Sequence, residues 1–293
     1  MTVRTMTTKV VPVRPTEFER IHDSLLVRLN PSIPQERWRR LFDWGWANPE
    51  DHTGFALVDD GGSFVGFVAT IYSERSVRGR VERFCNLSSW IVLDGYRSSG
   101  VGLIMPVLRR TDLTVTNLTS IPAVNRMFRS LGFQTLETHT RVCFPISGMT
   151  RVNRGSGGFE IVEEPSMRDP TLPDRIRGDL AALTGRCLHW LVRSKEGPCH
   201  LAFTLSRRRR LPTIRLHHVS DPSVFAAALP QLGLRFLFRY RAPQFETDER
   251  LLGDLEIPQS QKIALPETRL FRSRSVEARE ISNLYSELPL LNL

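Results

Sequence analysis

Hydrophobic and polar positions change their spacing twice within residues 83–108. Apolar and β-branched residues accumulate at positions 90–93, and Asp94-Gly95 then ends the run. A run bounded by a turn dipeptide predicts a buried strand. After a short polar stretch, apolar residues recur at the spacing of one helix face: Val101, Ile104, Met105 and Leu108. The pattern therefore predicts a strand, a turn and the start of a helix.

The turn between these two elements contains donors and small residues: Arg97, Ser98, Ser99, Gly100, Val101 and Gly102. Backbone N–H groups at the start of a helix lack partners within the helix, and the helix dipole favours an anion there. Glycines permit close approach of the backbone, while the arginine and serines add donors. The sequence thus indicates a phosphate-binding turn, although two glycines in a turn also occur where no ligand binds.

Strands and helices alternate through the rest of the N-terminal half. We expect strands at 10–15 and 113–118, helices at 16–29, 32–45 and 123–133, and a hairpin at 54–72. Trp38 and Phe42 lie one helical turn apart, which favours a place in the core. Trp44 and Trp46 stand beside a loop and fit either the core or a substrate pocket.

A Gly/Ser-rich stretch at 145–158 predicts a linker, after which the pattern restarts. We expect strands at 159–162, 187–192, 200–205, 213–219 and 234–238, and helices at 173–185 and 276–288. Ser220-Asp221-Pro222 predicts the N-cap of a further helix, which Gly233 would end. This order parallels the first half, so we expect a tandem repeat whose second copy lacks the glycine turn.

The motif Arg-x-x-Gly-x-Gly at 97–102, after a strand ending at Leu93, resembles the pyrophosphate loop of the GNAT superfamily of acyl-CoA-dependent N-acyltransferases. The helix 123–133, which ends in Leu-Gly-Phe, is similar to that family's next helix. The resemblance covers residues 10–146. It implies an α/β fold with a mixed sheet and a GNAT domain at 1–146. Together with the restarted pattern, it leads us to expect a linker at 147–158 and a degenerate GNAT-like domain at 159–293.

The resemblance also implies a reaction and a cofactor site. Acetyl-CoA or another acyl-CoA would be the co-substrate, and the acceptor would be an amine on a small molecule or a protein. The turn at 97–102 would hold the pyrophosphate, and the backbone of Ile91, Val92 and Leu93 would meet the acyl carbonyl. Ile121-Pro122 stand where the family often has an asparagine that binds CoA, so Asn117 or Asn125 would have to replace it.

The catalytic residues depart from the family pattern. The family often carries a carboxylate near the position of Phe84, so Glu82, on the same strand face, is the candidate general base; alternatively it only pairs with Arg80 or Arg83. The polar strand residues Asn86, Ser88 and Ser89 could orient an acceptor or a water molecule. Phe128 stands where many members have a tyrosine that protonates the CoA thiolate. A catalytically silent CoA- or metabolite-binding regulatory protein therefore remains the alternative.

Composition and charge limit the remaining function classes. With 41% hydrophobic and 24% charged residues, the chain of 293 residues is typical of a globular protein. No apolar run predicts a membrane span or signal peptide, so we expect a cytoplasmic protein. The four cysteines show no C-x-x-C pair, and no metal is expected. The net charge of +9 suits an anionic cofactor. A four-arginine run at 207–210 is typical of a hairpin tip, and nucleic acid is not expected.

Overall fold

The computed structural model describes residues 7–144, 158–253 and 255–293. Contacts divide the chain into two compact units. Unit 1 comprises Met1–Gln134, Arg269–Val276 and Tyr285–Leu291, and unit 2 comprises Thr135–Thr268, Glu277–Leu284 and Asn292–Leu293. The division differs from the two contiguous domains expected from the sequence, because C-terminal segments return to unit 1. The expected linker at 147–158 lies outside the described residues, apart from Gly158.

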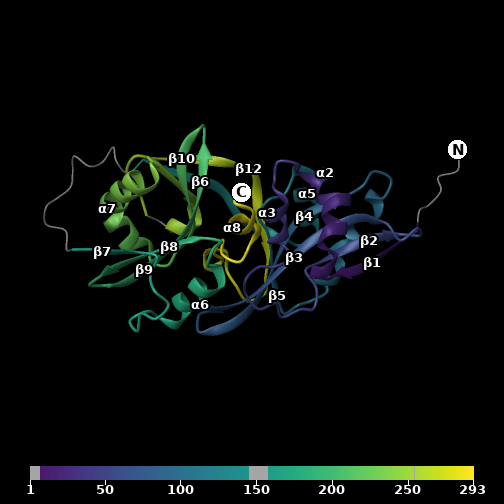
Figure 1. Ribbon diagram of the computed structural model, residues 1–293, viewed down its shortest axis with the longest axis horizontal. Helices are drawn as coiled ribbons and strands as arrows, with labels where there is room; N and C mark the ends of the chain where they lie inside the picture. Colours follow the sequence, from purple (N-terminus) through teal and green to yellow (C-terminus); the bar gives the residue numbers. More distant parts are fainter. Residues whose placement is uncertain (1–6, 145–157, 254) are drawn as a thin grey trace. The chain divides into compact units, whose positions relative to one another are not determined.

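Unit 1 is built on a sheet with the strand order β1-β2-β3-β4-β5-β12 (Figure 1). The strands are β1 (Thr8–Val13), β2 (Gly54–Asp59), β3 (Phe64–Val77), β4 (Arg80–Val92), β5 (Leu113–Asn117) and the end of β12 (Ser260–Arg272). The helices are α1 (Phe18–Ile21), α2 (Val27–Leu29), α3 (Gln35–Arg39), α4 (Met105–Leu108), α5 (Pro122–Ser130) and α8 (Glu287–Leu291). Only β4 and β5 pair in parallel among the pairings that the structure describes in this unit.

Unit 2 repeats this arrangement with the strand order β6-β11-β10-β9-β8-β7. Its strands are β6 (Gln134–Cys143), β7 (Glu160–Glu163), β8 (Leu188–Ser194), β9 (Gly197–Arg208), β10 (Leu211–Val219) and β11 (Gln244–Asp248). The long helices are α6 (Asp174–Leu183) and α7 (Pro222–Tyr240). As in unit 1, three antiparallel strands lead into a strand that pairs in parallel with the strand after the next helix, here β10 with β11.

The sixth strand of each sheet is contributed by the other repeat. β12 follows β11 along the chain but pairs antiparallel with β5 at Leu270–Arg272. β6 follows β5 and α5 but pairs antiparallel with β11. Each sheet therefore consists of five strands in one chain order plus a strand exchanged between the repeats.

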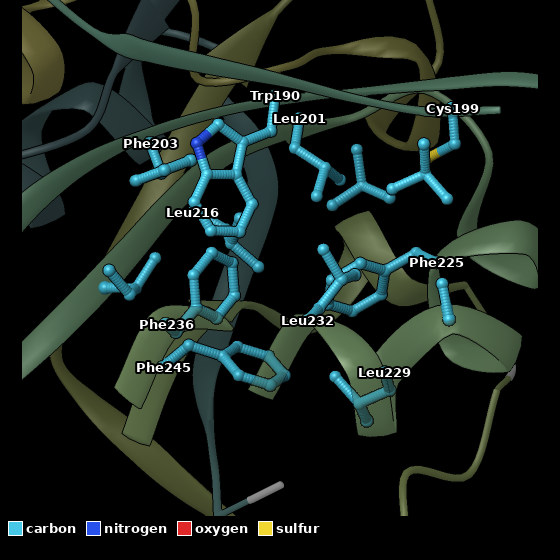
Figure 2. Close-up of a cluster of buried hydrophobic side chains, with 14 of the residues drawn as sticks. Trp190, Cys199, Leu201, Phe203, Leu216, Phe225, Leu229, Leu232, Phe236 and Phe245 are labelled. Atoms are coloured by element: carbon cyan, nitrogen blue, oxygen red, sulfur yellow. The ribbon is translucent and has the colours of Figure 1, made fainter. Parts of the chain in front are cut away.

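The core of unit 2 lies between α7 and one face of the sheet. Figure 2 shows Trp190, Leu201 and Leu216, from three neighbouring strands, directed toward Phe225, Leu229 and Phe236 of α7. Alternate residues of a strand point to opposite faces, so the intervening positions of β8 and β9 belong to the other face of the sheet. Leu191 confirms this, because it packs with Ile176 and Leu180 of α6.

Two sequence-based elements are wrong, and the helix expected at 32–45 is α-helical only over α3. The strand expected at 234–238 is the end of α7, which continues through Gly233 to Tyr240. Leu232 and Phe236 keep the helical burial period, and this packing outweighs the roughly 1 kcal/mol that a helical glycine costs. The terminal helix expected at 276–288 is an irregular segment, with a short 3-10 helix (Ala278–Glu280) followed by α8.

The physical cause of the irregular segment is local hydrogen bonding. The side chain of Glu280 accepts from the backbone N–H of Glu277 at 3.0 Å, which closes a single turn. Asn283 N–H then donates to His217 O at 3.1 Å rather than to a carbonyl one turn earlier. Ile281, Leu284 and Leu288 are buried all the same, so their apolar spacing reflects packing without a continuous helix.

Other sequence-based expectations are confirmed. Trp38 and Phe42 are buried in the core, as expected. Asp221 caps α7, and the arginine run forms the turn of the β9–β10 hairpin, where Arg209 and Arg210 have positive φ. Within the described residues, no helix is both long and apolar enough to cross a membrane.

Candidate functional site

Strand β4 separates from β5 halfway along its length. The two strands pair only from Arg83 to Leu87 on β4 and from Leu113 to Asn117 on β5. At the point of separation, the Asn117 side-chain amide donates to Leu87 O at 3.2 Å. Residues 88–92 continue along β3 but have no pairing with β5 within the described part of the chain. The edge that they leave open carries backbone groups available to a ligand.

The pairing with β3 decides which backbone groups face this open edge. Leu93 N–H donates to Val65 O at 2.9 Å, so Leu93 is engaged by β3 and is not available to an acyl carbonyl. Adjacent residues of a strand direct their N–H groups to opposite edges, and Val92 N–H therefore points to the open edge. Ile91 shares the orientation of Leu93. Of the three residues expected to donate to the acyl carbonyl, only Val92 directs its backbone N–H to the open edge.

A β-bulge lies next to this edge. Ser89 and Trp90 together oppose Val68, and Ser89 has a φ of +52°. The extra residue interrupts the alternation of side chains, so the face shared by Asn86 and Ser88 ends before Trp90. The Ser88 and Ser89 hydroxyl oxygens lie 3.2 Å apart, and Ser88 is buried.

The expected phosphate-binding turn forms a 3-10 helix at Arg97–Leu103, followed by α4. No side chain caps its start at Tyr96. Gly100 packs against β4: a Cβ there would lie 3.3 Å from Val92 Cγ2, which ties the turn to the open end of the strand. Arg97 is exposed and pairs with Asp94 at 2.7 Å. Ser98 and Val101 are exposed and Ser99 and Gly102 are half-buried, so the turn is accessible from solvent.

Helix α5 carries an apolar side chain, Phe128, at the position expected for the acid that protonates the CoA thiolate. Phe128 is fully buried, with its ring 5.7 Å from that of Trp90 and 4.5 Å from that of Phe133. It cannot donate a proton to a leaving thiolate. Asn125, on the same helix, is also buried.

Glu82 lies far from the open edge. It is six residues before Ser88, about 20 Å along an extended strand. Its carboxylate accepts a hydrogen bond from Ser275 Oγ at 2.8 Å. The structure thus does not bring Glu82 together with residues 88–92, and its position does not favour the role of base.

A different carboxylate, Glu287 of α8, lies at the separating strands. Its backbone N–H donates to Asn86 Oδ1 at 3.2 Å, and Thr119 Oγ1 donates to its Oε1 at 2.8 Å. Asn86 precedes the open edge by two residues on β4, and Thr119 follows the end of β5 by two residues. The Asn86 amide is itself oriented by Thr116 Oγ1 at 3.1 Å. Glu287 is therefore held between the two strands where they part.

The environment of Glu287 gives it the properties of a base. The residue is fully buried, and its Oε2 has no hydrogen-bond partner among the described residues. Burial raises the pKa of Glu287 to about 7, although the hydrogen bond from Thr119 favours the charged form. A buried carboxyl group that titrates near neutrality is suited to general acid–base catalysis.

Aromatic side chains gather around the residue two positions earlier, Tyr285. Its ring lies 5.0 Å from that of Trp46, and the Arg75 guanidinium lies 5.2 Å from its centroid. Tyr285 has a φ of +57°, a strained conformation for a residue other than glycine. Trp44 is buried, whereas Trp46 is partly exposed, so Trp46 is the tryptophan that remains a candidate for acceptor contact.

Sequence reasoning missed Glu287 because it is 201 residues from Asn86 along the chain. The available signal was a single carboxylate in an otherwise apolar stretch, with leucines at positions 284, 288, 290 and 291. Glutamate is rarely fully buried without a partner, so such a residue marks a candidate site once its burial is known.

No protein-family model matches the chain, and no curated protein matches its sequence. Solved structures do match. A conserved protein of unknown function from Enterococcus faecalis V583 aligns over 92% of this chain and 72% of its own, with a TM-score of 0.61 and 14% identity. A GCN5-related N-acetyltransferase from Kribbella flavida aligns over 93% and 72%, with a TM-score of 0.59 and 15% identity.

A second GCN5-related N-acetyltransferase, from Anabaena variabilis ATCC 29413, aligns over 91% of this chain and 72% of its own, with a TM-score of 0.57 and 12% identity. These alignments extend through both units. At this level of identity they establish architecture without assigning a substrate. The chain has the fold of the GNAT superfamily.

Proposed function

We propose that the protein transfers an acyl group from acyl-CoA to an amine. The observation that carries the proposal is the buried Glu287 carboxyl group held at the point where β4 leaves β5. The open edge of β4 and the turn at 97–102 supply a backbone donor and an uncapped turn for the thioester and the pyrophosphate.

The residues suit the individual steps of amide formation. Val92 N–H is directed to the open edge, where it can polarise the thioester carbonyl. The amine nitrogen forms the new C–N bond. Because Asn86, which holds Glu287, precedes Val92 by six residues on β4, the proton that the nitrogen loses passes to Glu287 through water molecules. The C–S bond then breaks, and the CoA thiolate receives that proton back from Glu287, since Phe128 cannot supply one. An amide and CoA thiol leave, with the carboxylate restored.

Phe128 supports a second candidate, a CoA-binding protein that has lost catalysis. Its buried apolar ring removes the proton donor expected at that position. Binding of acyl-CoA is common to both candidates, and amine-dependent release of CoA thiol distinguishes them.

The test begins with thermal denaturation in the presence of acetyl-CoA, longer acyl-CoAs and free CoA. Binding should raise Tm by mass action. Ser98→Asp places a carboxylate beside the proposed pyrophosphate, and Ser98→Asn is the uncharged control of similar size. Gly100 is less suitable, because any side chain there also presses on Val92. We expect the shift to be lost with Ser98→Asp and kept with Ser98→Asn.

Turnover is then measured as CoA thiol release with a panel of primary amines. Amine-dependent release in the wild type supports acyl transfer. Binding without turnover by any amine would favour the silent binding protein, and the absence of a Tm shift with every CoA derivative would contradict both candidates.

A further inference from the structure

The face of the unit 2 sheet opposite α7 carries a row of histidines. Trp190 and Leu201 point toward α7 (Figure 2), so their neighbours His189 and His200 point to the other face. The His189 and His200 rings stack at 5.3 Å with an interplanar angle of 13°, and His189 Nδ1 lies 3.0 Å from His200 Nε2. Both are buried.

A β-bulge in β10 adds a third histidine to this row. Leu216 pairs with Phe203, and His218 pairs with Ala202, so His217 is an inserted residue. Without the insertion, alternation from Leu216 would direct position 218 toward the apolar core under α7. With it, His218 faces the same side as His200, and their ring centroids are 5.4 Å apart.

Helix α6 covers this face and supplies a carboxylate. Asp179 is buried, and one potential ligand atom from each of Asp179, His200 and His218 lies within 4.8 Å of the other two. These residues come from α6, β9 and β10. All of them belong to unit 2.

The hydrogen bonding of His200 favours a role as ligand. Its Nδ1 has no hydrogen-bond partner among the described residues, although the side chain is fully buried. A proton on His200 Nε2, donated to His189 Nδ1, leaves the Nδ1 lone pair of His200 for a metal ion.

We propose that Asp179, His200 and His218 bind a divalent transition-metal ion of the zinc class. Nitrogen and carboxylate oxygen ligands in a buried site suit Zn²⁺ or Co²⁺. His189 would orient His200 from outside the coordination shell. The site is independent of the proposed acyl transfer, and it departs from the sequence-based expectation of no metal.

The geometry requires a modest contraction. A tetrahedral zinc ion with bonds of about 2.0–2.1 Å holds its ligand atoms about 3.4 Å apart. The three ligand atoms must therefore approach one another by up to about 1.5 Å, a movement that side-chain rotation can supply. An open fourth position would be filled by water.

One cation already faces the cluster. Arg175 Nη2 lies 3.2 Å from His218 Nε2, and the arginine is exposed at the start of α6. Its charge opposes a second cation, and its hydrogen bond occupies a potential ligand atom. Metal binding must therefore displace the Arg175 guanidinium. Removing this side chain should strengthen metal binding, whereas removing a ligand should weaken it.

The experiment measures Zn²⁺ binding to full-length protein after chelator treatment, by calorimetry and by the metal-dependent shift in Tm. Asp179→Asn and His218→Asn should each weaken binding by more than about 100-fold, beyond the 10–100-fold cost of losing an outer-shell partner. His189→Phe should fall within that outer-shell range. Arg175→Ala should tighten binding about tenfold, because the competing charge is removed.

His217→Asn is the matched control, since His217 is a buried histidine of the same bulge whose Nε2 lies 3.0 Å from Thr204 Oγ1. It should leave zinc affinity unchanged, and the visible absorption of the Co²⁺ form should report four-coordinate metal in the wild type and be lost with Asp179→Asn. Arg175→Ala alters an exposed side chain and keeps the test decisive if a ligand variant fails to fold. The proposal is overturned if neither wild type nor Arg175→Ala binds Zn²⁺, or if His217→Asn and Asp179→Asn weaken binding equally.

Discussion

The two units share a strand–helix–strand crossover but differ in the turn that joins the first strand to the helix. In unit 1, the turn after β4 starts without a side-chain cap. In unit 2, Asp221 follows β10, and its Oδ1 accepts from the N–H groups of Ser223 at 2.9 Å and Val224 at 3.0 Å. A carboxylate thus occupies the donors that a phosphate would need. One capping residue is enough to close an anion site while the fold is kept.

The two units also differ in the side chain that lies where their parallel strands separate. In unit 2, β10 and β11 pair only as far as Arg215 and Glu246, and the segment beyond them holds Arg250 against Asp248 and Asn283. In unit 1, the corresponding position holds Glu287, whose Oε2 lacks a partner among the described residues. A paired arginine stabilises a closed structure, whereas a carboxyl group with an unused oxygen is available for proton transfer.

Replacing the unit 1 carboxyl group should have the largest effect. Glu287→Gln keeps the shape and the hydrogen bond from Thr119 but removes the base, so kcat for acyl transfer should fall by about 10²–10⁴-fold. Glu82→Gln is the control and should remain near the wild-type rate, because Glu82 lies at the other end of β4. The comparison between the units fails if Glu287→Gln retains full kcat.

Breaking the unit 2 network should reduce stability rather than activity. Arg250 is buried between Asp248 and Glu137. Arg250→Met leaves two buried carboxylates without their cation, and we expect a loss of about 3–5 kcal/mol in the free energy of unfolding by urea. Arg239→Met, at an exposed pair with Glu163, should change it by less than about 1 kcal/mol. Equal effects of the two variants would contradict the assigned difference.

The third-largest expected effect is a pH dependence of stability that arises from Glu287. Its pKa is raised from 4.5 to about 7, so the folded state holds the proton more tightly than the unfolded state does. Its stabilising contribution is fully present below the unfolded-state pKa of 4.5 and is lost as pH rises through about 7. The free energy of unfolding should fall by up to about 3 kcal/mol over this range. Urea denaturation on either side of this window should show the loss in wild type and not in Glu287→Gln.

Removing the unit 2 cap should have the smallest effect. Asp221→Ala frees the first N–H groups of α7 and should lower the free energy of unfolding by about 1 kcal/mol. Acyl-CoA binding should be unchanged, because the ligand is proposed to bind unit 1. A Tm shift with acyl-CoA that depends on position 221 would place the cofactor in unit 2 and contradict the proposed site in unit 1.

Sequence patterns predicted most elements and the repeat, because local spacing and caps decide them. The turn at 97–102 and the cap at Asp221 were visible for the same reason. Glu287 was not, since its partners Asn86 and Thr119 are set by tertiary packing of a distant segment. His218 was missed because an inserted residue in β10 reverses the face that alternation assigns to it.

The neighbours of β6 and β12 could not be predicted either. No strand was expected from the sequence at either segment, and a hydrophobic pattern in any case gives the faces of a strand but not the edge it pairs with. The exchange of these two strands is a property of topology, and with it the unit boundaries departed from the contiguous domains expected.

The exchange of β6 and β12 also fixes the order in which the molecule can be assembled. On the ribosome, the strand beside β5 and the carboxyl group beside Asn86 are synthesised only after the whole of the second repeat. The first repeat therefore leaves the exit tunnel with an unpaired sheet edge that waits for residues 269–272. Its folding is coupled to the synthesis of the second repeat, and a gene divided between the repeats would encode two fragments that each carry a strand of the other's sheet.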